Sequence, residues 1–74
     1  LKEVIMPIFM AQIGKDYEIK KIGGLAETRR HLKNLGFVTG GNVCVVAVVN
    51  KNLIVQIKDS RVALGRELAG KIIV

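Results

Sequence analysis

The chain has 74 residues, half of them hydrophobic, and a formal net charge of +6. This length allows one small domain, which buries only about 60% of its unfolded surface. No stretch approaches the roughly 20 apolar residues of a transmembrane helix. The single cysteine excludes an intramolecular disulfide, which fits a reducing compartment. Much of the hydrophobic half is Val, Ile and Leu, and this composition favours a small barrel or sheet over a helical bundle.

The first nine residues show no clear period, and we expect residues 1–9 to form an N-terminal extension before a domain spanning residues 10–74. Pro7 disfavours a helix through Met6. Met6 could itself be the natural start, with the preceding residues an addition. The apolar segment is short, broken by Pro7 and without a small-residue cleavage site, so no signal peptide is expected. Residues 10–13 could form one helical turn, closed by Gly14.

Residues 16–22 alternate between polar and apolar side chains, which predicts a half-buried strand. Tyr17 and Ile19 fall on the inner face, and the charged residues beside them fall on the other. The glycine pair at 23–24 ends this strand and leads into a helix.

A helix is predicted over residues 25–35, because Leu25, Leu32 and Leu35 fall on one apolar stripe. We expect this stripe to pack against the rest of the domain. Gly36 follows the last periodic residue, at the position where helices commonly turn left-handed and end.

The C-terminal half predicts strands joined by tight turns. Residues 43–49 are β-branched and continuous, which indicates a well-buried central strand. Leu53, Val55 and Ile57 alternate with residues of the opposite face and predict a strand with one buried side. The other expected elements are a hairpin turn at 50–52, a tight turn at 59–60, a strand at 61–64, a helical turn at 66–71 and a closing strand at 72–74. About five strands with one inserted helix predict a mainly β fold, a small and partly open barrel.

Catalysis is not expected, because the chain has one histidine, one cysteine and no Ser-His-acid signature. A metal site is weakly supported, since His31 and Cys44 lie 13 positions apart without further nearby ligands. His31 could form a low-affinity surface site with Glu27, its neighbour one helical turn earlier. We therefore expect no resident cofactor, and leave weak binding of Fe²⁺ or another divalent metal open. The glycine pair at 23–24 precedes a helix but no Lys-Ser or Lys-Thr follows, so it is not a P-loop.

Basic residues on the predicted helix are candidates for binding a partner. Arg29, Arg30 and Lys33 form a basic surface that could meet an acidic protein or nucleic acid, or could simply be solvated. A competing contact surface lies on the C-terminal segment around Arg66 and Lys71. Small basic barrels that bind single strands usually add aromatic stacking platforms, which this sequence largely lacks, so nucleic acid is disfavoured.

Two sequence patterns resemble a known family. Residues 32–45 follow the pattern L-x-x-L-G-hydrophobic-x-x-G-x-x-V-x-V, and residues 63–74 follow A-L-x-x-E-L-A-x-x-I-x-V. Both patterns, with the opening turn at 11–14, resemble the FeoA family, the ferrous iron transport protein A. The resemblance covers nearly the whole chain from Met10 onward. The chain departs from the family in its longer, more apolar N-terminus and in Gly65 and Gly70, which weaken the last helical turn.

The resemblance implies an SH3-like β-barrel with an inserted α-helix. It implies a small cytoplasmic accessory protein that binds and regulates FeoB, a membrane ferrous iron transporter with a G-protein domain. The contact would be with that domain or with the membrane-proximal face, and the protein would lie peripheral to the inner membrane without inserting into it. The alternatives are a small basic nucleic-acid-binding barrel and the C-terminal type of domain found in metal-dependent regulators.

Overall fold

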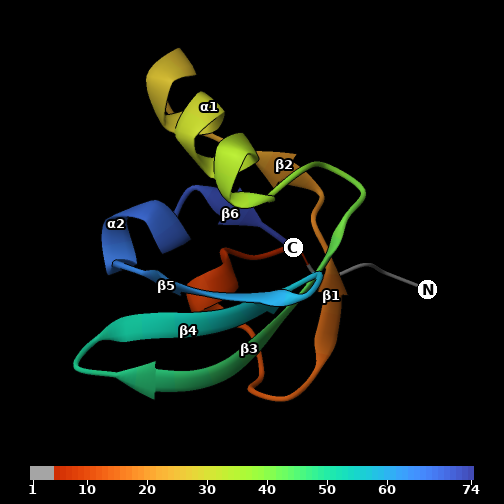
Figure 1. Ribbon diagram of the computed structural model, residues 1–74, viewed down its shortest axis with the longest axis vertical. Helices are drawn as coiled ribbons and strands as arrows, with labels where there is room; N and C mark the ends of the chain where they lie inside the picture. The colour runs from red at the N-terminus through yellow and green to blue at the C-terminus, as the bar shows by residue number, and fades with distance from the viewer. Residues whose placement is uncertain (1–4) are drawn as a thin grey trace.

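Four antiparallel strands form the main sheet of the computed structural model, which describes residues 5–74 (Figure 1). Their order in the sheet is β1-β3-β4-β5, and a second sheet pairs β2 with β6. The strands are β1 (Asp16–Glu18), β2 (Lys21–Ile22), β3 (Asn42–Val49), β4 (Asn52–Ile57), β5 (Ser60–Leu64) and β6 (Ile72–Ile73). The expected mainly β fold with an inserted helix is confirmed, with six strands rather than about five.

Three short helical segments complete the fold. They are the 3-10 helix η1 (Ile8–Met10), helix α1 (Ala26–Leu35) and helix α2 (Arg66–Ala69). Helix α1 lies at one end of the molecule beside the β2–β6 sheet, while the β3–β4 hairpin forms the opposite end (Figure 1). The segment between β2 and β3, which contains helix α1, therefore forms one end of the molecule and contacts the sheets through its buried residues.

The core is aliphatic except for Phe37, and no charged or polar residue among those described is buried. Leu53, Val55 and Ile57 of β4 are all buried, as the alternation predicts. The remaining core side chains come from every part of the fold and are Ile8, Ile19, Leu32, Phe37, Val43, Val45, Leu64, Ala69, Ile72 and Val74.

Strand β3 is less buried than its composition predicts. Val43 and Val45 lie in the core, but Val48 and Val49 are 54% and 52% exposed. The pairing of β3 with β4 shifts in register between Val45 and Ala47. Such a β-bulge breaks the alternation of faces and bends the strand. The end of the hairpin then extends beyond the core, so the expectation of a uniformly buried strand is wrong for its last residues.

Both tight turns are shorter or shifted relative to the sequence prediction. Asn50 and Lys51 both have positive φ, 50° and 69°, and form a two-residue hairpin turn, while Asn52 already pairs with Val49. The second turn lies one residue earlier than predicted, because Lys58 takes φ of 51°. Residue 60 therefore begins β5 instead of completing the turn.

The single strand predicted over residues 16–22 is two strands in the structure. After Glu18 the chain leaves β3, and the N–H of Lys20 donates to the carbonyl of Ile73 at 2.7 Å. Ile19, at the switch, is 1% exposed, and Tyr17 packs against the core, so the predicted inner face is confirmed. The chain changes its pairing partner from β3 to β6, and the alternation of side chains within one segment cannot predict such a change because it depends on residues far away in the sequence.

The N-terminal segment packs with the barrel from residue 6. The N–H of Met6 donates to the carbonyl of Val74 at 3.0 Å, and Pro7 forms a β-bridge with Ile73. The helical turn predicted at 10–13 is wrong; the turn lies at Ile8–Met10, because proline restricts the residue before it and can precede a helix. Residues 6–9 of the expected extension thus belong to the packed fold, and residues 1–4 lie outside the described residues.

Candidate functional site

Helix α1 is held by one narrow face. Leu32 is fully buried, and Leu35 packs against the core from a half-buried position. Leu25 does not share this stripe, contrary to the sequence prediction, and is 79% exposed. Its backbone is extended, with φ of −69° and ψ of 162°, so it precedes the helix and its side chain does not follow the helical period. Most of the helix surface therefore remains in solvent.

Gly36 ends the helix in a Schellman motif. It takes φ of 108°, its N–H donates to the carbonyl of Lys33 at 3.0 Å, and the N–H of Phe37 donates to the carbonyl of Leu32 at 2.9 Å. Phe37 enters the core directly beyond this turn and is 1% exposed. The predicted left-handed turn is confirmed, and it brings the next loop residues back alongside the helix.

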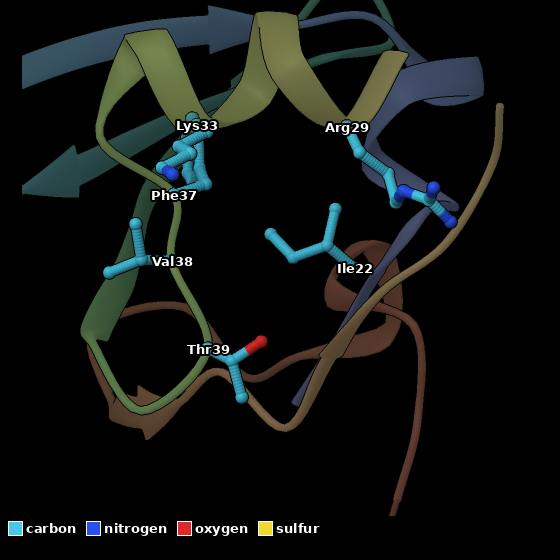
Figure 2. Close-up of a pocket in the computed structure, with 6 residues that line it drawn as sticks. All are labelled: Ile22, Arg29, Lys33, Phe37, Val38 and Thr39. Carbon is cyan, nitrogen blue, oxygen red and sulfur yellow. The ribbon is translucent and has the colours of Figure 1, made fainter. Parts of the chain in front are cut away.

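A pocket of about 290 Å³ lies between this loop, helix α1 and strand β2. Figure 2 shows its six side chains around an open space, with those of helix α1 on one side and Thr39 on the other. The lining residues are Ile22, Arg29, Lys33, Phe37, Val38 and Thr39. The pocket thus combines an apolar interior with two cationic side chains and one hydroxyl.

The two cations lie one helical turn apart and have no acidic neighbour on their side of the helix. Neither Arg29 nor Lys33 takes part in an ion pair within residues 5–74. At 3.6 residues per turn, Glu27 lies about 160° around the helix from Arg29 and about 120° from Lys33. Arg30 lies about 100° from Arg29 and does not line the pocket. The pocket is therefore a local site of positive charge.

The other two predicted contact residues lie elsewhere. The Arg66 guanidinium lies over the Phe9 ring, 5.5 Å from its centroid, in a cation–π arrangement. Lys71 is half-buried, and its aliphatic chain passes close to Gly24, just before helix α1. The structure thus brings Arg29 and Lys33 into one site, leaves Arg30 beside it and places Arg66 outside it.

The residues considered for metal binding do not assemble. No group of three or more His, Cys, Asp or Glu side chains that could hold a metal occurs in the described part of the chain. His31 is exposed on helix α1. Cys44 is half-buried on β3, where its thiol lies 3.7 Å from the carbonyl of Val45. Cys44 also borders a second hollow of about 250 Å³, whose lining includes one carboxylate, that of Asp16, and one cation, Lys58, which is unfavourable to a bound metal.

Glu18, the last residue of β1, forms an ion pair with Lys20, which lies just beyond the strand. The Lys20 ammonium donates to a carboxylate oxygen of Glu18 at 2.8 Å. This hydrogen bond, aided by the charge of Lys20, lowers the pKa of Glu18 below its ordinary value. Neither residue lines the pocket, so this ionisation is separate from the candidate site.

Comparison with known proteins identifies the family. The FeoA domain model matches residues 6–74. The chain belongs to the FeoA family. It is 32% identical over 68 residues to the "Putative Fe(2+) transport protein A" of Methanocaldococcus jannaschii, covering 92% of this chain and 83% of that protein.

Two solved FeoA structures share the fold. One, an iron uptake regulatory protein FeoA, superposes with a TM-score of 0.88 at 24% identity, over 97% of this chain and 96% of that one. The other is the zinc-complexed FeoA of Stenotrophomonas maltophilia, an SH3 domain protein, with a TM-score of 0.80 at 26% identity over 90% of this chain and 86% of that one. The FeoA domain described here is therefore an SH3-like barrel. Within residues 5–74 no helix has the length and apolar character needed to cross a membrane.

Sequence reasoning found the two cations of this FeoA domain but missed the rest of the pocket. Ile22, Val38 and Thr39 carry no recognisable motif, and Phe37 was noted only as part of the family pattern. The available signal was Gly36, because a left-handed turn after a helix sends the following residues back along the helix. Combined with the positions of the basic residues, that turn would have indicated which helix face the loop approaches.

Proposed function

We propose that this FeoA-family chain is an accessory protein of ferrous iron transport that binds and regulates the FeoB transporter from the cytoplasm. Family membership and the name of the M. jannaschii relative support the transport role. The observation that carries the binding role is the pocket beside helix α1, where Arg29 and Lys33 are without ion-pair partners among the described residues.

Such a surface is suited to recognition of an acidic protein face. Charges at the rim of an interface mainly set the rate of association and its dependence on salt. The contact surface on the transporter would be its G-protein domain or the membrane-proximal face, and the chain would reach the membrane only through that partner. We propose that it acts by binding, without catalysis and without a resident metal.

Surface plasmon resonance with the immobilised cytosolic domain of the transporter tests this proposal. Replacing Arg29 and Arg30 together by Glu should leave the fold intact, because exposed substitutions usually change stability by less than about 0.5 kcal/mol. The same double variant should bind more weakly at low salt, with the deficit shrinking as salt screens the charges. Circular dichroism and thermal unfolding of each variant confirm that the fold is retained.

The competing surface is tested with a second double variant, in which Arg66 and Lys71 become Glu. Weakening by this variant alone would move the contact to the C-terminal segment and rule out the face of helix α1. If the unmodified chain does not bind the transporter's cytosolic domain at any salt concentration, the proposed partnership is wrong.

A further inference from the structure

The pocket beside helix α1 has the size of a site for one or two side chains. Its volume of about 290 Å³ lies at the lower end of the range for small-molecule pockets, roughly 300–1,000 Å³. Ile22 and Val38 supply aliphatic walls, and Phe37 supplies part of the interior from the core. The pocket therefore has room to take up one or two side chains of a larger ligand and is too small to enclose a large cofactor.

The charges of the pocket select an anionic occupant. Arg29 and Lys33 lie on the helical side, and Thr39 faces them across the opening (Figure 2). None of the six lining residues is acidic, and Glu27 lies on another side of the helix. The Lys33 ammonium and the Arg29 guanidinium lie on opposite sides of the open space (Figure 2), so a carboxylate that enters the pocket would be attracted by both charges without bridging them.

The apolar walls distinguish among anions. A free inorganic anion would occupy the cationic rim and leave Ile22 and Val38 in water, losing the apolar contribution to binding. A single-stranded nucleic acid would need exposed aromatic faces for stacking, and the aromatic residue of the pocket, Phe37, is 1% exposed. The best match has an aliphatic group next to a carboxylate.

We propose that the pocket binds a segment of a partner protein in which an acidic side chain adjoins an aliphatic one. The positive charges of Arg29 and Lys33 attract the carboxylate, and the aliphatic side chain lies against Ile22 and Val38. This assignment rests on the proposed function, because it takes the transporter to be the protein that supplies the segment. It adds a specific ligand chemistry and separates Arg29 from its neighbour Arg30.

The chain offers a matched control for this assignment. Arg30 lies on the same helix, carries the same charge as Arg29 and is also exposed, but it does not line the pocket. If binding depends only on general electrostatic attraction, Arg29→Ala and Arg30→Ala should weaken it equally. If a carboxylate binds in the pocket, Arg29→Ala and Lys33→Ala should weaken binding much more than Arg30→Ala does.

The test uses NMR titration of the isotope-labelled full chain with terminally blocked peptides at low salt. The probe is Val-Glu-Ile, and the controls are the isosteric Val-Gln-Ile, a Val-Lys-Ile peptide, acetate and an oligothymidine. We expect saturable shifts at the amides of Ile22, Val38 and Thr39 with the Glu peptide. An exposed ion pair is worth about 0.2–1 kcal/mol, so the Gln peptide should bind roughly 1.4- to fivefold more weakly. Arg29→Ala and Lys33→Ala should each produce a similar loss, and Arg30→Ala little change.

Three results would overturn the assignment: equal binding of the Glu and Lys peptides, equal losses for Arg29→Ala and Arg30→Ala, or tighter binding of the oligothymidine at the same amides. The transporter's cytosolic domain provides a separate arm. Undiminished binding of that domain to both pocket variants would exclude the pocket while leaving the proposed function in place. Failure of the unmodified chain to bind it would reject the transporter as the source of the segment, and saturable binding of the Glu peptide would still support the pocket chemistry.

Discussion

Replacing Gly36 by Ala should destabilise the domain through backbone strain alone. Gly36 has φ of 108° and ψ of 2°, a conformation that L-residues rarely adopt. A Cβ atom built there would meet only the Ile57 side chain, at 3.8 and 3.9 Å, which is ordinary van der Waals contact. Because steric overlap is absent, the cost of the substitution is the cost of holding a non-glycine residue at positive φ.

The expected magnitude follows from two opposing effects. Left-handed backbone costs an L-residue roughly 1–2 kcal/mol. Replacing Gly by Ala also restricts the unfolded chain, which stabilises the fold by about 0.4–1 kcal/mol. The net destabilisation should be about 1 kcal/mol, or a fall in Tm of about 4–8 °C for a domain of this size. A β-branched replacement, Gly36→Val, should cost on the order of 1–2 kcal/mol, since its χ1 is also restricted.

Gly23→Ala is the matched control. Gly23 does not have positive φ, and a Cβ there would lie 3.7 Å from the nearest heavy atom, the Lys71 carbonyl oxygen. It shares the effect on the unfolded chain, so the difference between the two variants isolates the strain, about 1–2 kcal/mol. Urea unfolding followed by circular dichroism gives both free energies. Equal stabilities of the two variants would refute the assignment of strain to Gly36 and place the helix end elsewhere.

Three further predictions concern the core, the exposed ion pair and metal binding. Val55→Asp should abolish folding, because it places an unpaired charge at a fully buried position in a domain whose total stability is about 4–11 kcal/mol. The control Val48→Asp changes a residue that is 54% exposed and should remain folded by circular dichroism. A folded Val55→Asp variant would contradict the strand register. The lowered pKa of Glu18 means that its ion pair stabilises the fold above the unfolded pKa of about 4.3 and that this contribution is lost as pH falls through the lower folded value. Glu18→Gln should therefore flatten the acid side of the stability curve, and an unchanged acid side in urea melts would contradict the pairing. Titration calorimetry should show weak or no Fe²⁺ binding; a stoichiometric sub-micromolar site would refute this, with His31→Ala as the first control.

The features predicted correctly from the sequence are those that depend on neighbours along the chain. The alternation of Leu53, Val55 and Ile57 predicts one buried face, because successive side chains of a strand point to opposite faces whatever the strand pairs with. Gly36 indicates its own turn because the requirement for positive φ is local. The fold class was also predictable, since local alternation, composition and the family patterns agree on a small β-barrel.

The features that were missed depend on pairing between distant segments. The strand expected at 16–22 divides because its first part pairs with β3 and its second with β6, and nothing between residues 18 and 20 marks the change. The bulge after Val45 likewise depends on the fit of β3 against β4. Leu25 was misplaced by a single residue at the helix start, where the backbone is still extended and the helical period does not yet apply.

The pocket connects stability with binding through one side chain. Phe37 fills the core and also lines the pocket, so its substitution would damage the fold and the site together. Arg29 and Lys33 contribute to the pocket from exposed positions, so their substitution changes charge at little cost in stability. Gly36 affects both the core and the pocket, because its left-handed turn sets the position of the next residue, Phe37. The strain imposed by Gly36→Ala should therefore alter peptide binding as well as stability, even though Gly36 itself does not line the pocket.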